Sequence, residues 1–272
     1  MAYGDFEVSI EDGLPIRLYE FTMGASVWRY TSNDETLVIG GAKYLATAIS
    51  DDGSRQSGEA VSDTMSIRAP LTCGPAEIYM VAPPTEPIMV RIMAMHVGLT
   101  TPDIVYVGEV IQCDYPSPVL AVLSCQTLLA TMRREGVRLG WQRTCPYALY
   151  DPLTCKVNKT ALAFDGTVAA VNGFTLTVPE LASELEGKYT GGIVEWSHPV
   201  RGTQFLMVEQ HTGTFVSVFG ETGDMYEGMV LTFYPGCSRT TSACRTFNNL
   251  PNYGGAPGMP GKSPFEGEVI FY

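Results

Sequence analysis

Helical periodicity is almost missing from this chain, and that most constrains what it can fold into. No stretch of ordinary helix length places apolar residues at three- and four-residue spacing. Leu181 to Leu185 is at most one or two turns long, with Gly187 placed to end it. Val119 to Gln142 is ambiguous, since Leu128, Leu129 and Met132 suit a helix while Val119 to Leu123 suits a strand. Short runs rich in β-branched and aromatic residues alternate with turn residues instead. The sequence therefore predicts an all-β protein, mainly β with little helix.

The predicted strands fall into two groups, each typical of a barrel or sandwich. The first group comprises Phe6 to Ile10, Ile16 to Thr22, Ser26 to Thr31, Thr36 to Ile39, Tyr44 to Ile49, Ala76 to Val81, Met89 to His96 and Ile104 to Cys113. The second comprises Thr160 to Phe164, Thr167 to Val171, Phe174 to Val178, Gly191 to Trp196, Gln204 to Gln210, Thr214 to Phe219 and Met229 to Tyr234. Gly40-Gly41 and Asn172-Gly173 predict hairpin turns, because such turns need positive φ.

These groups divide the chain into four parts. We expect a first β unit over residues 1–126, and a crossover with the first of two cysteine pairs over 127–157. A second β unit over 158–236 follows, and then the second cysteine pair with an extended tail over 237–272. The tail is rich in Gly and Pro, which disfavour regular structure. We expect the two β units to be joined at a four-cysteine site.

The charge balance limits the partners. A formal net charge of −12, from 29 acidic and 17 basic residues, disfavours nucleic acid, whose binding is driven by clustered Lys and Arg. Only 17% of residues are charged, against about 25% in typical globular proteins. A surface covered by partner subunits and a large core with an ordinary surface explain this equally well.

Neither a membrane span nor an export signal is apparent. No run of about 18 apolar residues predicts a transmembrane helix. The first residues, MAYGDFEVSIEDGLP, are acidic and lack the apolar block of a signal peptide. We therefore expect a soluble product, made in the cytoplasm, with no stable membrane insertion.

Four of the seven cysteines form the strongest candidate site. Cys145 and Cys155 enclose nine residues, Cys237 and Cys244 enclose six, and both loops are rich in Thr, Ser or Pro. Thiolates suit Zn²⁺ or an iron–sulfur cluster, and four convergent ones satisfy either. The alternative is four buried, unconnected thiols. The other three, Cys73, Cys113 and Cys125, are interpreted as core or interface residues.

Other motifs carry weaker signals. The stretch Gly255 to Ser263 ends like a phosphate-binding loop, but Ala256 stands where the first glycine is required, so nucleotide binding is rejected. Three acidic clusters beside glycines have no full calcium-loop spacing and predict turns: Glu11-Asp12, Asp51-Asp52 and Glu221 with Asp224.

The three histidines are possible partners for a catalytic thiol. A cysteine–histidine hydrolase would pair Cys145 with His198 or His211, and no local signature supports this pairing. His96 lies in an apolar run and predicts a half-buried residue with its hydrogen bonds satisfied. His198 and His211 lie near turns, where we expect them exposed.

The last half of the chain resembles the C-terminal part of phage tail-tip hub proteins. The residues that carry this resemblance are Arg143-Thr144-Cys145-Pro146, Cys155, Cys237, Cys244, Phe247-Asn248-Asn249-Leu250-Pro251-Asn252-Tyr253-Gly254-Gly255, Pro257, Pro260-Gly261 and Pro264. The relatives in question are the gene-transfer-agent hub protein and, more distantly, the tail-tip protein of lambda-like phages. Near the N-terminus, Ile16 to Thr22 and Trp28 to Thr31 also look like that family's opening.

The resemblance implies a role for the four cysteines. In that family the matching cysteines ligate a [4Fe-4S] cluster, so Cys145, Cys155, Cys237 and Cys244 are the implied metal and cofactor ligands, with no catalytic residues. It also implies a non-enzymatic hub subunit of a siphophage tail tip, or baseplate, within the virion. The implied partners are two further copies in a homotrimer, the distal tail protein, the C-terminus of the tape measure protein, and the central fibre or receptor-binding proteins.

Two alternatives remain open from the residues alone. One is a tail-associated cell-wall hydrolase with a cysteine or a carboxylate pair as catalyst. The other is a zinc-binding β adaptor unrelated to phage. A catalytic thiol would be free and single, so the arrangement of the cysteines discriminates between these functions. The host, the receptor and any redox role are not specified by the sequence.

Overall fold

The computed structural model of the chain describes residues 15–53, 64–96, 99–128, 130 and 139–260. The chain folds into two compact units: unit 1 is Met1–Arg134 with Ser197–Gln204, and unit 2 is Glu135–Trp196 with Phe205–Tyr272. This division differs from the expected ranges, because residues 197–204 belong with unit 1. The predicted strand at residues 6–10 lies outside the described residues.

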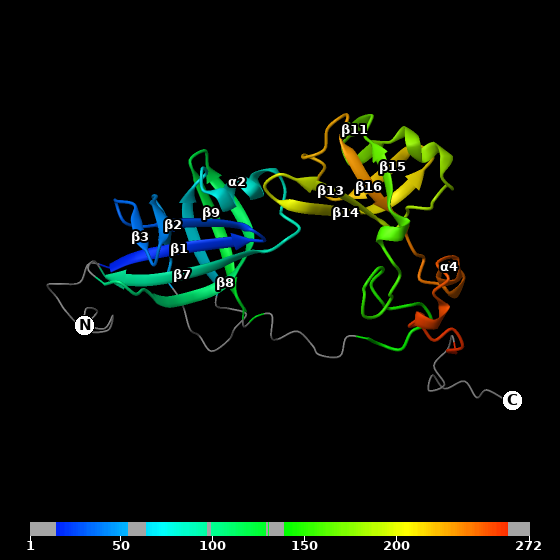
Figure 1. The fold of residues 1–272 in the computed structure, drawn as a ribbon, viewed down its shortest axis with the longest axis horizontal. Helices are drawn as coiled ribbons and strands as arrows, with labels where there is room; N and C mark the ends of the chain where they lie inside the picture. Colours follow the sequence, from blue (N-terminus) through cyan, green and yellow to red (C-terminus); the bar gives the residue numbers. More distant parts are fainter. Residues whose placement is uncertain (1–14, 54–63, 97–98, 129, 131–138, 261–272) are drawn as a thin grey trace. The chain divides into compact units, whose positions relative to one another are not determined.

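Unit 1 is built on one strongly curved antiparallel sheet with a single parallel pair (Figure 1). The order of its nine strands is β3-β4-β2-β1-β7-β8-β9-β6-β5. Their bounds are β1 Pro15–Met23, β2 Ser26–Thr31, β3 Leu37–Ile39, β4 Ala42–Ala46, β5 Ser50–Asp51, β6 Thr64–Pro70, β7 Ile88–His96, β8 Asp103–Ser117 and β9 Leu120–Thr127. The turn between β3 and β4 is Gly40-Gly41, both at positive φ as predicted.

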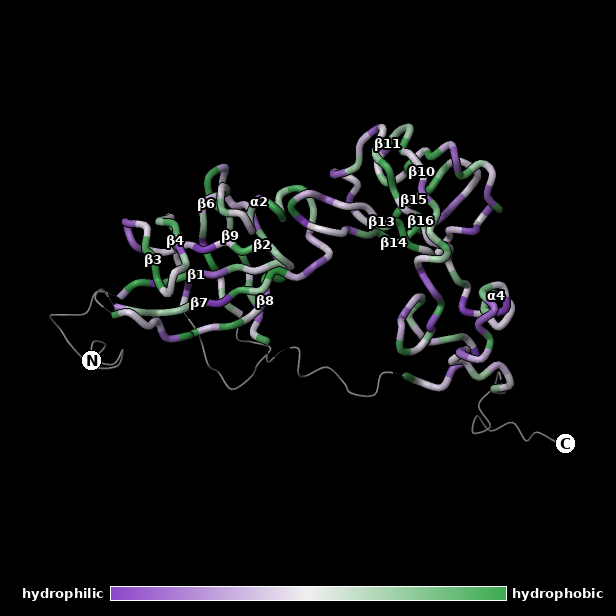
Figure 2. The backbone as a smooth tube through the Cα atoms, viewed as in Figure 1, coloured by the Kyte–Doolittle hydropathy of each residue, from purple (hydrophilic) through white to green (hydrophobic). Residues whose placement is uncertain are grey.

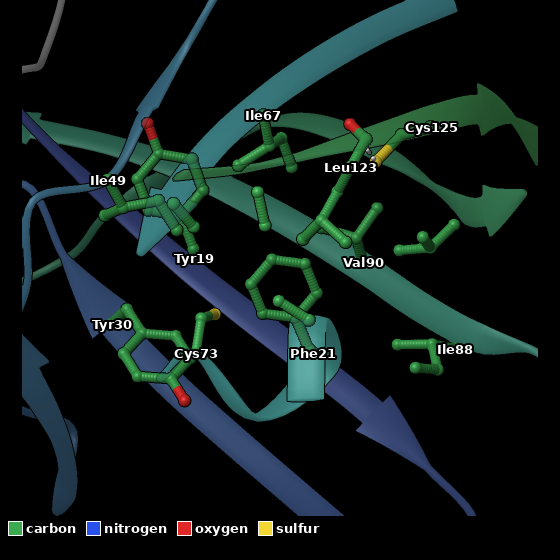
Figure 3. Close-up of a cluster of buried hydrophobic side chains, with 14 of the residues drawn as sticks. Tyr19, Phe21, Tyr30, Ile49, Ile67, Cys73, Ile88, Val90, Leu123 and Cys125 are labelled. Atoms are coloured by element: carbon green, nitrogen blue, oxygen red, sulfur yellow. Dashed lines mark hydrogen bonds between the residues drawn. The ribbon is translucent and has the colours of Figure 1, made fainter. Parts of the chain in front are cut away.

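Alternating side chains of the central strands form the core of unit 1. Tyr19 and Phe21 of β1 are fully buried against Ile67, Ile88 and Leu123 from β6, β7 and β9 (Figure 3). The intervening positions of β1 face a second, smaller cluster around Ile16, Leu18, Tyr44, Met93 and Met95. Burial on both faces explains why β1 carries large apolar residues at both odd and even positions.

The predicted strand at Ala76 to Val81 is wrong, because this segment is helix α2, Gly74–Val81. Ile78, Tyr79 and Val81 favour a strand by composition alone. Pro75, however, lies in the first turn of the helix. Its fixed φ suits a helix there, and its missing N–H costs no hydrogen bond because the N–H groups of the first turn have no partner within the helix. Ala76 and Ile78 are buried against the sheet of unit 1, and this packing decides the outcome.

Unit 2 contains a seven-stranded antiparallel sheet with the order β10-β16-β13-β14-β15-β12-β11. Its strands are β10 Phe164–Thr167, β11 Ala170–Asn172, β12 Thr175–Thr177, β13 Ile193–His198, β14 Gly202–Thr212, β15 Phe215–Phe219 and β16 Val230–Tyr234. Its core gathers alternate apolar residues from these strands, including Leu176, Val194, Val216, Leu231 and Phe233. Many of the hydrophobic residues of this unit, green along the tube in Figure 2, lie in its strands.

The remaining elements of unit 2 are short. They are η1 Thr160–Leu162, η2 Pro179–Ser183, α4 Thr241–Thr246 and η3 Leu250–Asn252. The element η2 overlaps the short helical stretch predicted at Leu181 to Leu185. No described helix is long and apolar enough to cross a bilayer. With sheets dominating both units, the prediction of an all-β protein is confirmed.

Candidate metal centre

All four candidate cysteines line one cavity of unit 2. Cys145, Cys155, Cys237 and Cys244 surround a volume of about 290 Å³. The apolar part of the lining includes Ile193 of β13 and Phe205 and Met207 of β14. Cys244 is buried and the other three are half-buried. Side chains from two loops far apart in sequence therefore meet around a single space.

The two cysteine loops are joined by backbone and side-chain hydrogen bonds. The amide N–H of Cys145 donates to the carbonyl oxygen of Arg239 at 2.9 Å. The hydroxyl of Tyr253 donates to the carbonyl oxygens of Arg143, at 2.8 Å, and Arg239, at 3.2 Å. The ring of Tyr147 lies against Gly254, where a Cβ would come within 2.4 Å of it. The residues flanking each cysteine pair are thus held together without a strand between them.

Unusual backbone conformations gather at this site. Among the described residues, the non-glycine residues with positive φ are Tyr150, Lys156, Arg239 and Asn248. Each lies within five residues of one of the four cysteines. This region of φ costs an ordinary L-residue roughly 1–2 kcal/mol, and such outliers persist where the surrounding structure holds them, commonly at functional sites. The loop conformations around the cavity therefore carry a local cost in free energy.

The end of helix α4 explains one of these conformations. Asn248, at φ 51°, follows the C-cap residue Phe247, and its N–H donates to Arg245 O at 2.8 Å. The next N–H, of Asn249, donates to Cys244 O at 3.0 Å. These two bonds form a Schellman motif, in which Asn replaces the usual Gly at the left-handed position. The motif turns the chain so that Asn249 follows Cys244 back toward the cavity.

Asn249 contacts the other cysteine pair. Its side chain is 8% exposed, and its Nδ2 lies 2.5 Å from the carbonyl oxygen of Cys155 and 3.9 Å from that residue's Sγ. A second sulfur also accepts a hydrogen bond, because the N–H of Arg239 lies 3.4 Å from Cys237 Sγ. In the sequence Asn249 stands out only as part of a resemblance, and its contact with Cys155 was not predicted. Two adjacent asparagines shortly after a cysteine-bearing helical turn were the available signal.

The electrostatics reflect the closeness of the four thiols. Burial raises the pKa of Cys244, and the negative charges of Cys237, Cys145 and Cys155 raise it further. A raised pKa keeps the Cys244 thiol protonated at neutral pH, and a positive centre at the site would favour its thiolate form instead. Within the described ranges, no three His, Cys, Asp or Glu side chains form a group that could hold one metal ion. Four thiols lining one cavity are the donor set that a four-iron cluster takes, with one thiolate on each iron.

The three remaining cysteines lie in unit 1, as core residues. Cys73 and Cys125 are buried in its main cluster, and Cys113 is half-buried and packs against it. Burial raises the pKa of Cys73 to about 12 and that of Cys125 to about 12. The interpretation of these thiols as core residues is consistent with this environment.

The histidines have different environments from those expected. His96 is 2% exposed rather than half-buried, and His211 is 1% exposed, so the expectation that His211 is exposed is wrong. The bulge between Val208 and Gln210 turns His211 inward, where its ring meets Tyr189 edge-on at 5.2 Å. Only His198, which is half-buried, accepts hydrogen bonds near a turn, from Val200 N and Arg201 N. Neither His198 nor His211 lines the cysteine cavity.

The acidic turn at Asp51-Asp52 holds the backbone and a tyrosine. Asp51 accepts from Gly53 N at 2.9 Å and from the Tyr19 hydroxyl at 2.7 Å, while Asp52 accepts from Ser66 N at 2.9 Å. The bond from Gly53 N to the Asp51 carboxylate is the kind that stabilises a turn, as predicted. The Glu11-Asp12 cluster and the end of the rejected phosphate loop lie outside the described residues.

Comparisons with known proteins point to phage and phage-like particles. Residues 187–263 match a family model described as "Phage conserved hypothetical protein BR0599". An uncharacterized protein of Xylella fastidiosa (strain 9a5c) is 27% identical over 242 residues, which cover 80% of this chain. The chain spans about half the length of this curated relative, 48%.

The fold is shared with a protein of a virion. A chain in the solved structure titled "Virion of native gene transfer agent (GTA) particle" superposes with a TM-score of 0.78 at 14% identity. The superposition covers 100% of this chain and 98% of that chain. At this identity the comparison establishes a common fold across the whole length.

Proposed function

We propose that this chain is a non-catalytic structural subunit of a long-tailed virion, acting as the hub of its tail tip. The observation that carries the proposal is the common fold with a chain of a gene transfer agent virion, over nearly all of both chains. The match of residues 187–263 to a phage family supports the same setting. In this role three copies form a ring that joins the distal tail protein and the C-terminus of the tape measure protein to the fibre or receptor-binding proteins.

The four cysteines hold a structural [4Fe-4S] cluster in this proposal. Support comes from the shared cavity, from the two sulfurs that accept N–H donors, and from the soft character of thiolate ligands. When bound, the cluster supplies four metal–thiolate bonds between the two loops. The chain's own residues orient the thiols and shield them with the apolar part of the lining from β13 and β14. Closing the long loop between Cys155 and Cys237 restricts the unfolded chain by about 4–5 kcal/mol, by analogy with a cross-link.

Replacing one ligand tests the proposal. We expect Cys237→Ser to lower the iron content of anaerobically purified protein, to make residues from about 145 onward sensitive to protease, and to block tail-tip assembly. The matched control is Cys113→Ser, since Cys113 is also half-buried but lies in unit 1. Stoichiometric zinc without iron would contradict the cluster and leave the structural role standing. Normal yields of infectious particles from an iron-free variant would contradict both.

Assembly state is tested separately. Mass measurement of purified tail tips should give three copies of the chain. A folded monomer without affinity for tail proteins would contradict the hub role. Measurable peptidoglycan hydrolysis by the purified chain, abolished by Cys145→Ser, would favour the hydrolase alternative instead.

A further inference from the structure

The position of Asn249 is set by the helix end that carries one of the cysteines. Cys244 lies in α4, and its carbonyl oxygen accepts the N–H of Asn249 across the Schellman motif. This bond fixes the Asn249 backbone relative to the second cysteine pair. Because the side chain is almost fully buried, its amide has few conformations available.

The amide of Asn249 then reaches the first cysteine pair. A primary amide has two N–H donors on one nitrogen. From its position 2.5 Å from the Cys155 carbonyl oxygen and 3.9 Å from the Cys155 sulfur, Nδ2 can direct one hydrogen to each. The same residue therefore contacts Cys155 by its side chain and Cys244 by its main chain, although these cysteines belong to different loops.

A neighbouring asparagine orients this amide. Nδ2 of Asn252 donates to Oδ1 of Asn249 at 2.7 Å, and the Asn252 N–H donates to the Asn249 carbonyl oxygen at 3.0 Å. An oxygen that accepts from Asn252 leaves the nitrogen of the same amide facing Cys155. Asn252 and Asn249 therefore form a chain of hydrogen bonds from η3 to the Cys155 thiol.

The geometry points to Asn249 as a residue that positions the ligands of the centre. Asn249 holds Cys155 in place relative to Cys244 and donates a hydrogen bond to the Cys155 thiolate. This inference rests on the proposed cluster and assigns a function to a residue that is not a ligand. Hydrogen bonds to the ligating sulfurs stabilise the more negative, reduced state of an iron–sulfur centre and so tune its reduction potential. Loss of this donor should lower the potential, which a merely structural residue would leave unchanged.

The experiment compares adjacent asparagines. Full-length wild type, Asn249→Ala, Asn249→Asp and the control Asn248→Gly are reconstituted with iron and sulfide without oxygen, and the potential is measured by a redox titration of the visible spectrum. Asn248→Gly keeps the left-handed conformation at the helix end and removes no side-chain contact to a thiol. Its reduction potential should therefore match that of wild type. Asn249→Ala should lower the potential, and Asn249→Asp should lower it further because a carboxylate repels added electrons.

The outcomes separate this inference from the proposed function. Wild-type potentials in both Asn249 variants, or an equal shift in Asn248→Gly, would overturn the role of Asn249 while leaving the cluster intact. Wild-type protein that takes up no iron would overturn the cluster and this inference with it. If the Asn249 variants retain no iron, Asn252→Ala is the deciding variant, because it removes the hydrogen bond that orients the Asn249 amide. A lowered reduction potential in Asn252→Ala supports the role of Asn249, and a wild-type potential overturns it.

Discussion

At the scale of single residues, the cysteine site depends on small side chains and on left-handed backbone. Gly254 allows the Tyr147 ring to lie against the main chain, and Asn248 closes a helix in a conformation that most residues avoid. Neither residue would bind a metal. Both set the path of the loops that carry the ligands, so substitutions that change this packing or this backbone conformation should affect the centre, whereas Asn248→Gly preserves the conformation.

Gly254→Ala is a direct test of this packing. The added Cβ would meet the Tyr147 ring at 2.4 Å, so either the ring or the loop must move. We expect a loss of about 1–3 kcal/mol in unfolding free energy and reduced iron retention. Gly258→Ala is the matched control in the same tail, because a Cβ added there would have nothing within 4 Å of it. Denaturant unfolding and iron analysis of both variants check the prediction; equal stability of the two would contradict it.

The buried thiols of unit 1 predict a pH dependence. Burial raises the pKa of both Cys73 and Cys125 from 9.0 to about 12. Their contribution to stability is therefore fully present below pH 9 and is lost as the pH rises toward 12. At pH 10.5 we expect a loss of about 2 kcal/mol per thiol relative to pH 8. A Cys73→Ala, Cys125→Ala double variant should lose less over this range, as measured by urea unfolding; a parallel loss would sink the assignment.

At the scale of elements, neighbouring strands of unit 1 are tied by a charged cluster. Glu20 of β1 is 8% exposed and binds Arg29 of β2 at 2.6 Å and Arg91 of β7 at 2.5 Å. The three residues are direct partners in the strand register. A carboxylate between two guanidinium groups is satisfied on both oxygens.

Removing this carboxylate should destabilise the three central strands. The two arginines are partly exposed, so water compensates for part of the loss, and we expect Glu20→Ala to cost about 2–3 kcal/mol of unfolding free energy. The control is Glu35→Ala, whose side chain is exposed. Chemical denaturation at low and high salt distinguishes the two variants. No greater loss in Glu20→Ala than in Glu35→Ala would show that the cluster contributes little.

Sequence patterns predicted most of the strands, but they missed β6, Thr64–Pro70, and placed a strand where helix α2 lies. Alternation at Ile16 to Thr22 and the glycines at 40 and 41 act locally, so β1 and the β3–β4 hairpin could be predicted. Helix α2 was missed because its composition is strand-like; Pro75 was a local signal for a helix start, whereas burial against the sheet is a tertiary effect. Spacing also placed the four cysteines as candidates, whereas the role of Asn249 depends on contacts between loops far apart in sequence. Whether the cysteines bind a cluster stays a prediction.

At the scale of the whole molecule, each unit has its own hydrophobic core. The main clusters of the two units share no residue, and the four cysteines lie in unit 2. Stability and metal binding should therefore respond differently to core substitutions in the two units.

A pair of core truncations tests this separation. Ile67 and Leu231 are both fully buried, in unit 1 and unit 2 respectively. Each truncation to Ala should cost about 2–5 kcal/mol through lost burial and a residual cavity. We expect Leu231→Ala to reduce iron retention under mild denaturation and Ile67→Ala to leave it at the wild-type level. Calorimetry with iron analysis checks both; equal loss of iron would contradict the separation.

The cysteine loops contain little regular structure, and this affects how loading of the site can be observed. Residues 139–163 and 235–260 contain no strand, and their helical content is limited to η1, α4 and η3. Far-ultraviolet circular dichroism reports mainly on the sheets, so filled and empty protein should give nearly the same spectrum. A preparation judged intact by its secondary structure can then be inactive in assembly, and only a probe of the loops, such as visible absorption or peptide-level hydrogen exchange, will tell the two forms apart.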